Sequence, residues 1–212
     1  MPPSPAAEAV ARFEPRKLAL VRAAYDLIAR AGFENLRTRA VADRVGCNVA
    51  TLHHYFPTKE ALIGGVALYL AAQFETVRAP AGPAGSARDR LAQEFADTSF
   101  YMREQPDMME VMRELSARAR RDQAIAAIIE PLTRYWRMSL EQVIAEGMTS
   151  GDFDPGMSAD EAAGVLIALL WGAASLPLRP DDLTDVRRAV ESWLIPEPST
   201  QEPSTQSKRA KR

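Results

Sequence analysis

The chain of 212 residues is poor in the residues that build disulfide-linked or metal-bound domains. Its one cysteine, Cys47, excludes an internal disulfide framework and suits a reducing cytoplasm. Its two histidines are adjacent and have no cysteine or carboxylate at the spacing of zinc ligands. Glycine-rich phosphate loops and nucleophile elbows are also missing, so nothing in the sequence supports an enzyme. We therefore expect no metal and no cofactor.

Long hydrophobic runs are scarce as well. The only membrane-like segment, residues 162–178, has seventeen uncharged residues that include two glycines and a serine. A membrane-spanning helix needs about 20 mostly apolar residues, so we interpret this segment as a helix buried on most of its sides. The first seventeen residues have no apolar core of the length that a secretory signal needs. We expect a cytoplasmic protein without a membrane segment.

Charge is unevenly distributed along the chain. Residues 1–60 carry nine Lys and Arg against six Asp and Glu, a net charge of +3. Residues 61–196 carry thirteen against twenty, a net of -7, and residues 197–212 carry four against two, a net of +2. The basic ends are where a nucleic-acid contact is expected, and the middle of the chain is acidic.

The most informative segment is residues 37–59, RTRAVADRVGCNVATLHHYFPTK, which predicts two short helices joined by a tight turn. Thr38 is a good N-cap for the first helix, and Gly46 can end it because glycine adopts the left-handed conformation easily. Asn48 can cap the second helix, which we expect to end ahead of Pro57.

The second helix has one apolar side and one unusual side. Leu52 and Phe56 stand four residues apart, so they share the face that packs inward. The residues left facing outward are small, polar or aromatic: Val49, Ala50, Thr51, His53, His54 and Tyr55. Small residues permit close approach to a major groove, and hydroxyl and imidazole groups reach phosphates or base edges.

From Leu20 to Leu62 the sequence resembles the tetracycline-repressor-like (TetR) family of transcriptional regulators. The residues that fit the family pattern are Gly32, Phe33, Thr38, Gly46, Thr51, Leu52, Tyr55, Phe56, Lys59, Glu60 and Leu62. The resemblance implies an all-α fold with an N-terminal three-helix helix-turn-helix DNA-binding domain and a C-terminal helical ligand-binding and dimerisation domain. It also implies a homodimer on a double-stranded DNA operator.

Phosphate contacts are expected from Thr38, Thr51 and Lys59, which would fix the register of the protein on DNA without reading sequence. We expect the Tyr55 hydroxyl to do the same. In the family a phosphate-touching tyrosine commonly stands where His53 stands, and an imidazole can substitute as a shorter donor.

We expect base contacts from Val49, Ala50 and His54. The first two can meet thymine methyl groups, and His54 can donate to a guanine acceptor. The family often has lysine and glycine in place of Val49 and Ala50, so this chain departs from the pattern there. The alternative for His53 and His54 is that they are only solvated helix residues.

The sequence divides into four parts. Residues 1–14 are rich in proline and alanine and are expected to form a flexible arm, followed by the DNA-binding domain over 15–60. Residues 61–195 are expected to form the helical ligand-binding and dimerisation domain. Residues 196–212 contain GluProSerThrGln twice and a basic end, which predicts a disordered tail. Apolar periodicity and Pro and Gly positions predict helices over 15–31, 58–78, 87–104, 106–119, 122–149, 159–176 and 181–194.

The resemblance and one local observation point to a ligand cavity. Six of the eight methionines lie between Met102 and Met148, and methionine is common where a pocket must accept varied apolar shapes. We expect a small apolar or aromatic ligand, with an ordinary helical core as the alternative. The expected lining is Phe95, Ser99, Met102, Met112, Tyr135, Trp136 and Ser139.

Two helix faces near the end of the chain are candidates for a dimer interface. Gly164, Ala168 and Gly172 recur every four residues and form a smooth strip that allows close helix packing. The matching face of the last helix carries Val186, Val190 and Trp193. Both faces could pack inside one chain, but pairing across a two-fold axis as a four-helix interface is the more economical account.

These observations favour a homodimeric, ligand-responsive transcriptional regulator, specifically a repressor released by its ligand, on a near-palindromic operator. An architectural DNA-binding protein without a ligand is one alternative. An enzyme that uses the helical cavity and a degenerate regulator that pairs only with other proteins are two more.

Overall fold

The computed structural model describes residues 5–76, 85–176 and 180–195. Within these ranges all regular structure is helical, which is the predicted fold class. The elements are α1 (Pro5–Ala11), α2 (Pro15–Ala31), the short 3-10 helix η1 (Phe33–Asn35), α3 (Thr38–Val45), α4 (Val49–Tyr55), α5 (Lys59–Thr76), α6 (Ala87–Glu104), α7 (Pro106–Ala119), α8 (Gln123–Ser150), α9 (Ala159–Ser175) and α10 (Pro180–Leu194). The tail predicted over 196–212 lies outside the described residues.

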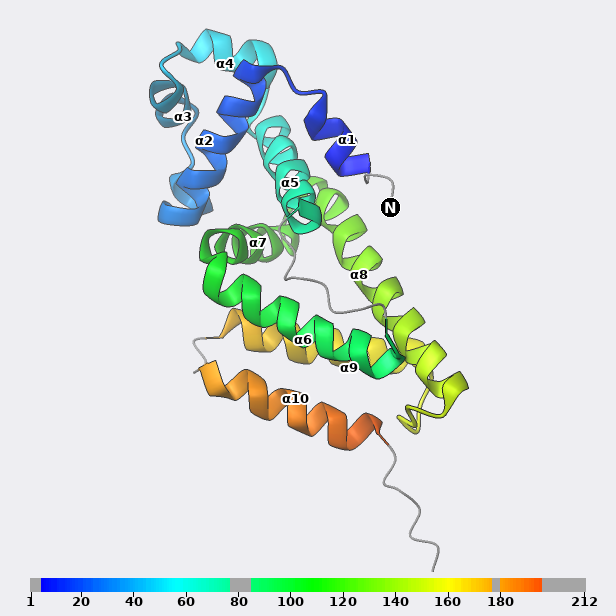
Figure 1. Cartoon of the computed structure of the whole chain (residues 1–212). Helices are drawn as coiled ribbons and strands as arrows, with labels where there is room; N and C mark the ends of the chain where they lie inside the picture. Colours follow the sequence, from blue (N-terminus) through cyan, green and yellow to red (C-terminus); the bar gives the residue numbers. More distant parts are fainter. Residues whose placement is uncertain (1–4, 77–84, 177–179, 196–212) are drawn as a thin grey trace, which may run out of the picture.

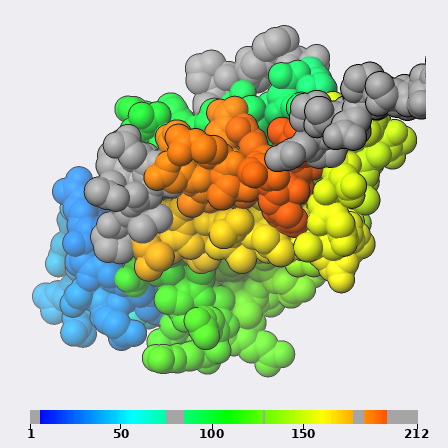
Figure 2. All heavy atoms as spheres, turned by 90° about the horizontal axis from the view of Figure 1, so that it is seen from below, coloured from blue at the N-terminus to red at the C-terminus, as the bar shows by residue number. Residues whose placement is uncertain are grey.

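The helices form two bodies that α5, α7 and α8 connect (Figure 1). α2, α3 and α4 form the end of the molecule that holds the helix-turn-helix, and α5 leads from them toward the rest of the chain. At the other end, α6, α9 and α10 lie alongside one another, and Figure 2 shows α9 and α10 side by side at the surface.

The first hydrophobic core begins in the helix-turn-helix and continues into the second body. Fully buried residues of α2 to α5 include Leu20, Ile28 and Leu62. The same cluster contains residues of α7 and α8, among them Leu115 and Ile125. A three-helix unit of this size buries too little apolar surface to be stable alone. It is therefore completed by helices that follow it in sequence.

The second core joins the far half of α8 to α6, α9 and α10. Its side chains include Phe95, Leu140 and Leu166, all buried. The turn after α8 returns Phe153 onto that helix, where its ring covers Gly147 so closely that a Cβ at residue 147 would overlap it. This glycine is required by packing, because any side chain there displaces the ring.

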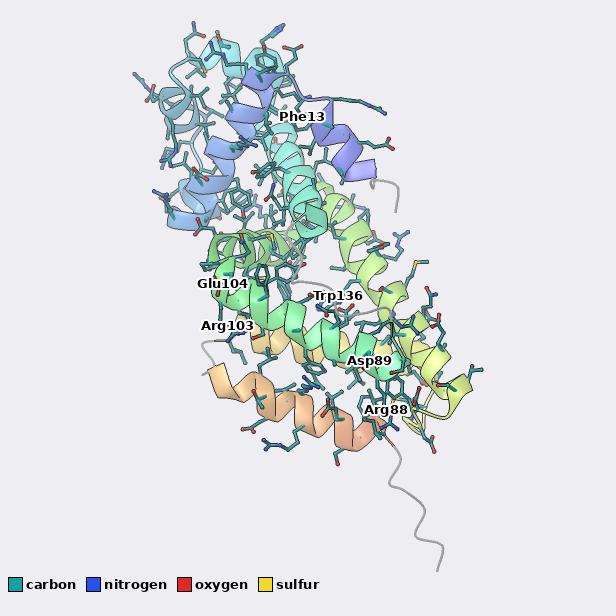
Figure 3. All side chains as sticks on the ribbon, in the orientation of Figure 1. Phe13, Arg88, Asp89, Arg103, Glu104 and Trp136 are labelled. Carbon is teal, nitrogen blue, oxygen red and sulfur yellow. The ribbon has the colours of Figure 1, made fainter. Side chains whose placement is uncertain are left out.

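The N-terminal segment corrects one expectation. Residues 5–11 form α1, which packs against α5, where a flexible arm over 1–14 was predicted. Alanine favours the helical conformation, and proline is tolerated in a first turn. Phe13, labelled in Figure 3, then packs against the first core. Seven residues are too few to show a helical period, and the anchoring contact comes from a distant helix.

Candidate DNA-binding site

The turn between α3 and α4 is built as the sequence predicts. Gly46 has a φ of 70° and a ψ of 40°, in the left-handed region that favours glycine. Asn48 caps α4, since its side-chain oxygen accepts hydrogen bonds from the backbone N–H of Thr51 at 2.8 Å and from the Thr51 hydroxyl at 2.9 Å. These bonds fix the direction in which α4 leaves the turn.

The two faces of α4 differ sharply in exposure. Leu52 is fully buried and Phe56 is 3% exposed, so one face is anchored in the first core. Ala50, His53 and His54 are exposed on the other face. The remaining predicted contact residues, Val49, Thr51 and Tyr55, are half-buried. The structure therefore leaves both imidazoles accessible to a partner instead of covering them with the protein's own body.

Two of the predicted phosphate contacts, Thr38 and Lys59, lie outside α4, at the starts of α3 and α5. Thr38 is the first residue of α3, and the N-cap is Arg37, whose side chain makes no capping bond; the expectation that Thr38 is the cap is wrong. The Lys59 ammonium lies 4.9 Å from the centroid of the Phe33 ring, a cation–π distance. The side chains of Thr38 and Lys59 are both half-buried.

Tyr55 has a partner that the sequence did not predict. Its hydroxyl donates a hydrogen bond to the carboxylate of Glu14, with 3.1 Å between the oxygens. This hydrogen bond, followed by slight desolvation and the negative charge of Glu14, raises the pKa of Tyr55, while Arg16 opposes the increase. Glu14 lies 41 positions away in sequence, so no local pattern could have identified the pair.

Sequence comparisons decide the family. Residues 20–66 match the bacterial regulatory proteins of the tetR family, and residues 87–194 match the C-terminal domain of BetI-type transcriptional repressors. The second match alone spans just over half of the 212 residues. The chain belongs to the TetR family. It is accordingly a DNA-binding transcriptional regulator, and the exposed face of α4 belongs to its helix-turn-helix.

Solved structures share this TetR fold at low sequence identity. A TetR transcription regulator from Haloarcula marismortui ATCC 43049 is 21% identical, with a TM-score of 0.72 over 85% of this chain and 97% of that one. A transcriptional regulator from Rhodococcus sp. Rha1 is 22% identical, with a TM-score of 0.69 over 83% and 94%. A regulator from Saccharomonospora viridis, solved in complex with choline, is 21% identical, with a TM-score of 0.68 over 85% and 98%. Among curated proteins, none matches this chain in sequence.

In this TetR-family chain, the predicted dimer residues of α9 differ in how open they are to a partner. Ala168 is exposed, and a Cβ on Gly172 would meet no atom within 4 Å. A Cβ on Gly164, in contrast, would lie 3.3 Å from the guanidinium of Arg137, which the Asp160 carboxylate holds over it at 2.7 Å. Arg137 therefore covers the first glycine of the predicted strip.

An apolar strip nevertheless runs along the outside of α9. Ala168 and Gly172 belong to it together with three large exposed side chains: Val165 at 40%, Leu169 at 40% and Leu176 at 58% exposure. These positions recur at helical spacing on one face. Helical spacing in the sequence indicates this face too, because Val165 and Leu169 each stand one position after a small residue of the predicted strip.

The predicted face of α10 turns mostly inward. Val190 is 1% exposed and Val186 is half-buried, and both pack in the second core. The Trp193 indole N–H donates to the backbone oxygen of Pro155 at 3.2 Å. α10 thus uses its apolar stripe within its own chain. It exposes polar residues such as Arg188 instead.

The residues predicted to line a ligand pocket are not brought together. Phe95 lies in the second core and Met112 in the first, while Tyr135 is 59% exposed on the outside of α8. The Trp136 indole N–H (Figure 3) donates to the Glu94 carboxylate at 3.1 Å between α8 and α6. Ser99, Ser139 and Met102 are half-buried. Adjacent positions on α8 diverge by about 100°, and here Tyr135 points to solvent while Trp136 points toward α6.

Two hollows lie on the described part of the second body. One, of about 120 Å³, is lined by residues of α6, α7 and α9 and includes Met102, Met109 and Arg113. The other, of about 350 Å³, is lined by residues of α8 alone, from Gln142 to Ser150. Neither contains the predicted set. Ligand pockets usually measure about 300–1,000 Å³, so the first hollow would have to widen to hold a typical ligand.

The described ranges lack two further features. No three or more of their His, Cys, Asp and Glu side chains gather as metal ligands would. None of their helices combines the length and hydrophobicity that crossing a membrane demands.

Proposed function

We propose that the protein is a repressor that binds a near-palindromic operator as a homodimer and is released from it by a small ligand. The observation that carries this proposal is the two-sided burial of α4. Its inner side, Leu52 and Phe56, is fixed in a core, and its outer side presents Ala50, His53 and His54. A rigid helix with small and hydrogen-bonding residues outside suits a major groove.

On this proposal, contacts with DNA divide into two kinds. Val49, Ala50 and His54 contact base edges, whereas Thr51 and Tyr55 contact phosphates. Thr38, His53 and Lys59 add further phosphate contacts. Both the hydroxyl and the backbone N–H of Thr51 donate to Asn48, so the hydroxyl oxygen would reach a phosphate through a water that donates to both. Positioning contacts affect all sequences alike, and base contacts alone distinguish operators.

The second copy is proposed to pack on the outer strip of α9. Three large apolar side chains there, Val165, Leu169 and Leu176, are 40–58% exposed, which is costly in water and favours association. Gly172 and Ala168 between them would allow the two copies of α9 to approach closely. A two-fold axis through this strip would pair the same residues of α9 from both copies, and binding to one operator requires that the axis also bring the two α4 helices to one side of the dimer.

Release by a ligand requires contact between the two bodies, and α7 provides it. The Glu114 carboxylate on α7 accepts a hydrogen bond from the backbone N–H of Phe33 at 2.6 Å, at the bend between α2 and α3. Arg118 of the same helix lies 5.2 Å from the Phe33 ring centroid. A ligand that shifts α7 would therefore shift the helix-turn-helix. A coupling of about 1–3 kcal/mol would weaken operator binding roughly 5- to 150-fold.

The ligand is proposed to enter between α6, α7 and α9, where Met102 and Met109 line the smaller hollow. Apolar or aromatic compounds suit these side chains. The choline complex of the Saccharomonospora regulator adds choline to the compounds worth testing. Ligands that bind the folded state raise its melting temperature, so a thermal-shift screen identifies them.

The deciding experiment selects bound duplexes from random DNA with the full chain. A near-palindromic consensus bound at least about 10³-fold more tightly than random duplex, at fixed salt, is expected of a specific regulator. Little preference would instead indicate an architectural protein, and binding without salt dependence would contradict the proposal altogether.

The dimer is tested separately by Gly172→Leu. The monomer has open space at this position, so the variant should fold normally yet sediment as a monomer and lose operator affinity. Gly172→Ala is the matched control that keeps the helices close. A Gly172→Leu chain that still sediments as a dimer would place the interface elsewhere.

A further inference from the structure

Glu14, the residue that precedes α2, lies beside the proposed DNA surface without belonging to the helix-turn-helix. Figure 1 shows the start of α2 at the same end of the molecule as α4. Glu14 is exposed and occupies the N-cap position of α2, but its side chain makes no capping hydrogen bond. Its carboxylate instead accepts the hydroxyl proton of Tyr55 at 3.1 Å. An N-cap side chain is thus directed away from its own helix and toward α4.

A carboxylate and a DNA phosphate would compete for this hydroxyl. Both are anionic oxygen acceptors, and a phenol has one proton to donate. Two negative charges about 4 Å apart repel each other even in water. DNA that approaches Tyr55 must therefore displace Glu14, or else leave the Tyr55 hydroxyl without a phosphate.

Basic groups nearby favour the phosphate once the carboxylate has moved. Arg16 lies close enough to Tyr55 to lower the pKa of its hydroxyl, against the larger effect of Glu14. The Lys17 ammonium lies 4.6 Å from the centroid of the Phe13 ring and 5.5 Å from that of Phe56, at the base of the same surface. Glu14 is thus an acidic residue next to two basic ones, Arg16 and Lys17, at the start of α2.

We propose that Glu14 competes with DNA phosphate for Tyr55 and thereby limits the affinity of the protein for DNA of any sequence. The inference rests on the proposed function, since it requires that Tyr55 contact a phosphate. Its consequence concerns specificity in the cell. A genome offers a very large excess of non-operator sites, so weak general affinity leaves more protein available to the operator.

Glu14→Gln tests the proposal, because glutamine keeps an oxygen acceptor for Tyr55 and removes the negative charge. We expect the variant to bind both the selected operator and a scrambled duplex roughly fivefold more tightly at low salt. The gain should shrink as salt rises, because salt screens exposed charges. Glu34→Gln is the matched control: it removes an 88% exposed carboxylate just beyond the opposite end of α2, and it should change affinity less than about twofold.

Tyr55→Phe tests whether the gain in DNA affinity from Glu14→Gln depends on the Tyr55 hydroxyl. Without the hydroxyl for which the two anions compete, Glu14→Gln should give a smaller gain than in the wild-type chain, measured as a double-mutant cycle. Circular dichroism of each variant checks that the fold is unchanged. The inference is overturned if Glu14→Gln gains no more than Glu34→Gln, or if its gain is equally large in the Tyr55→Phe background. If the wild-type chain shows no salt-dependent DNA binding, the proposed function fails first and this inference with it.

Discussion

The two bodies of this TetR-family regulator expose opposite chemistry on their uncovered helices. α4 presents Ala50, His53 and His54 to solvent, while its apolar side chains are buried. α9 presents Val165 and Leu169, each 40% exposed, although neighbouring helices cover its other side. Polar side chains such as His53 and His54 are well solvated when no DNA is bound. Exposed apolar side chains are more stable when another surface buries them. The exposed face of α4 therefore needs no covering helix, whereas the exposed strip of α9 is where we propose that a second copy packs.

The strongest test of this contrast separates the two faces of α4. Leu52→Ala removes a fully buried side chain from the first core and should lower the free energy of unfolding by about 2–5 kcal/mol. His53→Ala, one position away and exposed, should leave stability within about 0.5 kcal/mol and weaken binding to all duplexes. Urea titration and DNA-binding isotherms measure the two effects. Comparable stability losses would mean that α4 is not two-sided.

A second test compares two glycines of the other body. Gly147→Ala places a Cβ against the Phe153 ring and should destabilise the protein by about 1–3 kcal/mol. Gly172→Ala adds the same methyl group where no atom lies within 4 Å, so it should stabilise the monomer by about 0.5–1 kcal/mol. Thermal or urea unfolding of both variants gives the sign of each change in the free energy of unfolding. If both stabilise, then the ring does not cover Gly147 in solution.

A third test concerns the contact that joins the two bodies. Glu114→Ala leaves the backbone N–H of Phe33 without its acceptor and should cost about 1–3 kcal/mol of stability. Glu114→Gln keeps an acceptor oxygen and should cost less. Hydrogen exchange of the Phe33 amide should be fastest in the alanine variant, slower in the glutamine variant and slowest in the wild type. Equal rates in all three would show that α7 does not hold this bend.

What the sequence predicts well is local, and what it misses depends on how helices rotate against each other. Pro106 and the apolar spacing after it predict a helix over 106–119, and α7 has these bounds. Asn48 and Gly46 act within a few residues of themselves, so their roles follow from spacing. Val190 is buried and Tyr135 is exposed because of the way α10 and α8 are turned against their neighbours. No periodicity within one helix specifies that rotation.

The contact between Glu14 and Tyr55 shows the same limit at the DNA surface itself. Tyr55 is recognisable from the pattern of the second helix, but its acceptor lies 41 residues earlier, ahead of a different helix. Likewise, the packing of α1 on α5 depends on a surface that forms only after the chain has folded. Sequence therefore places Tyr55 on the helix proposed to meet DNA, but it does not identify Glu14, the group that binds the Tyr55 hydroxyl.

The smallest expected effect tests the turn that orients α4. Asn48→Ala removes the acceptor of two hydrogen bonds from Thr51 and should lower stability by about 1 kcal/mol. Asn48→Asp keeps a side-chain acceptor and should retain most of that stability, while adding a negative charge near phosphate that weakens DNA binding. The two variants thus separate capping from charge, when unfolding and DNA binding are measured together. If Asn48→Asp loses as much stability as Asn48→Ala, the cap does not act through its side-chain oxygen, and the orientation of α4 must come from Leu52 and Phe56 alone.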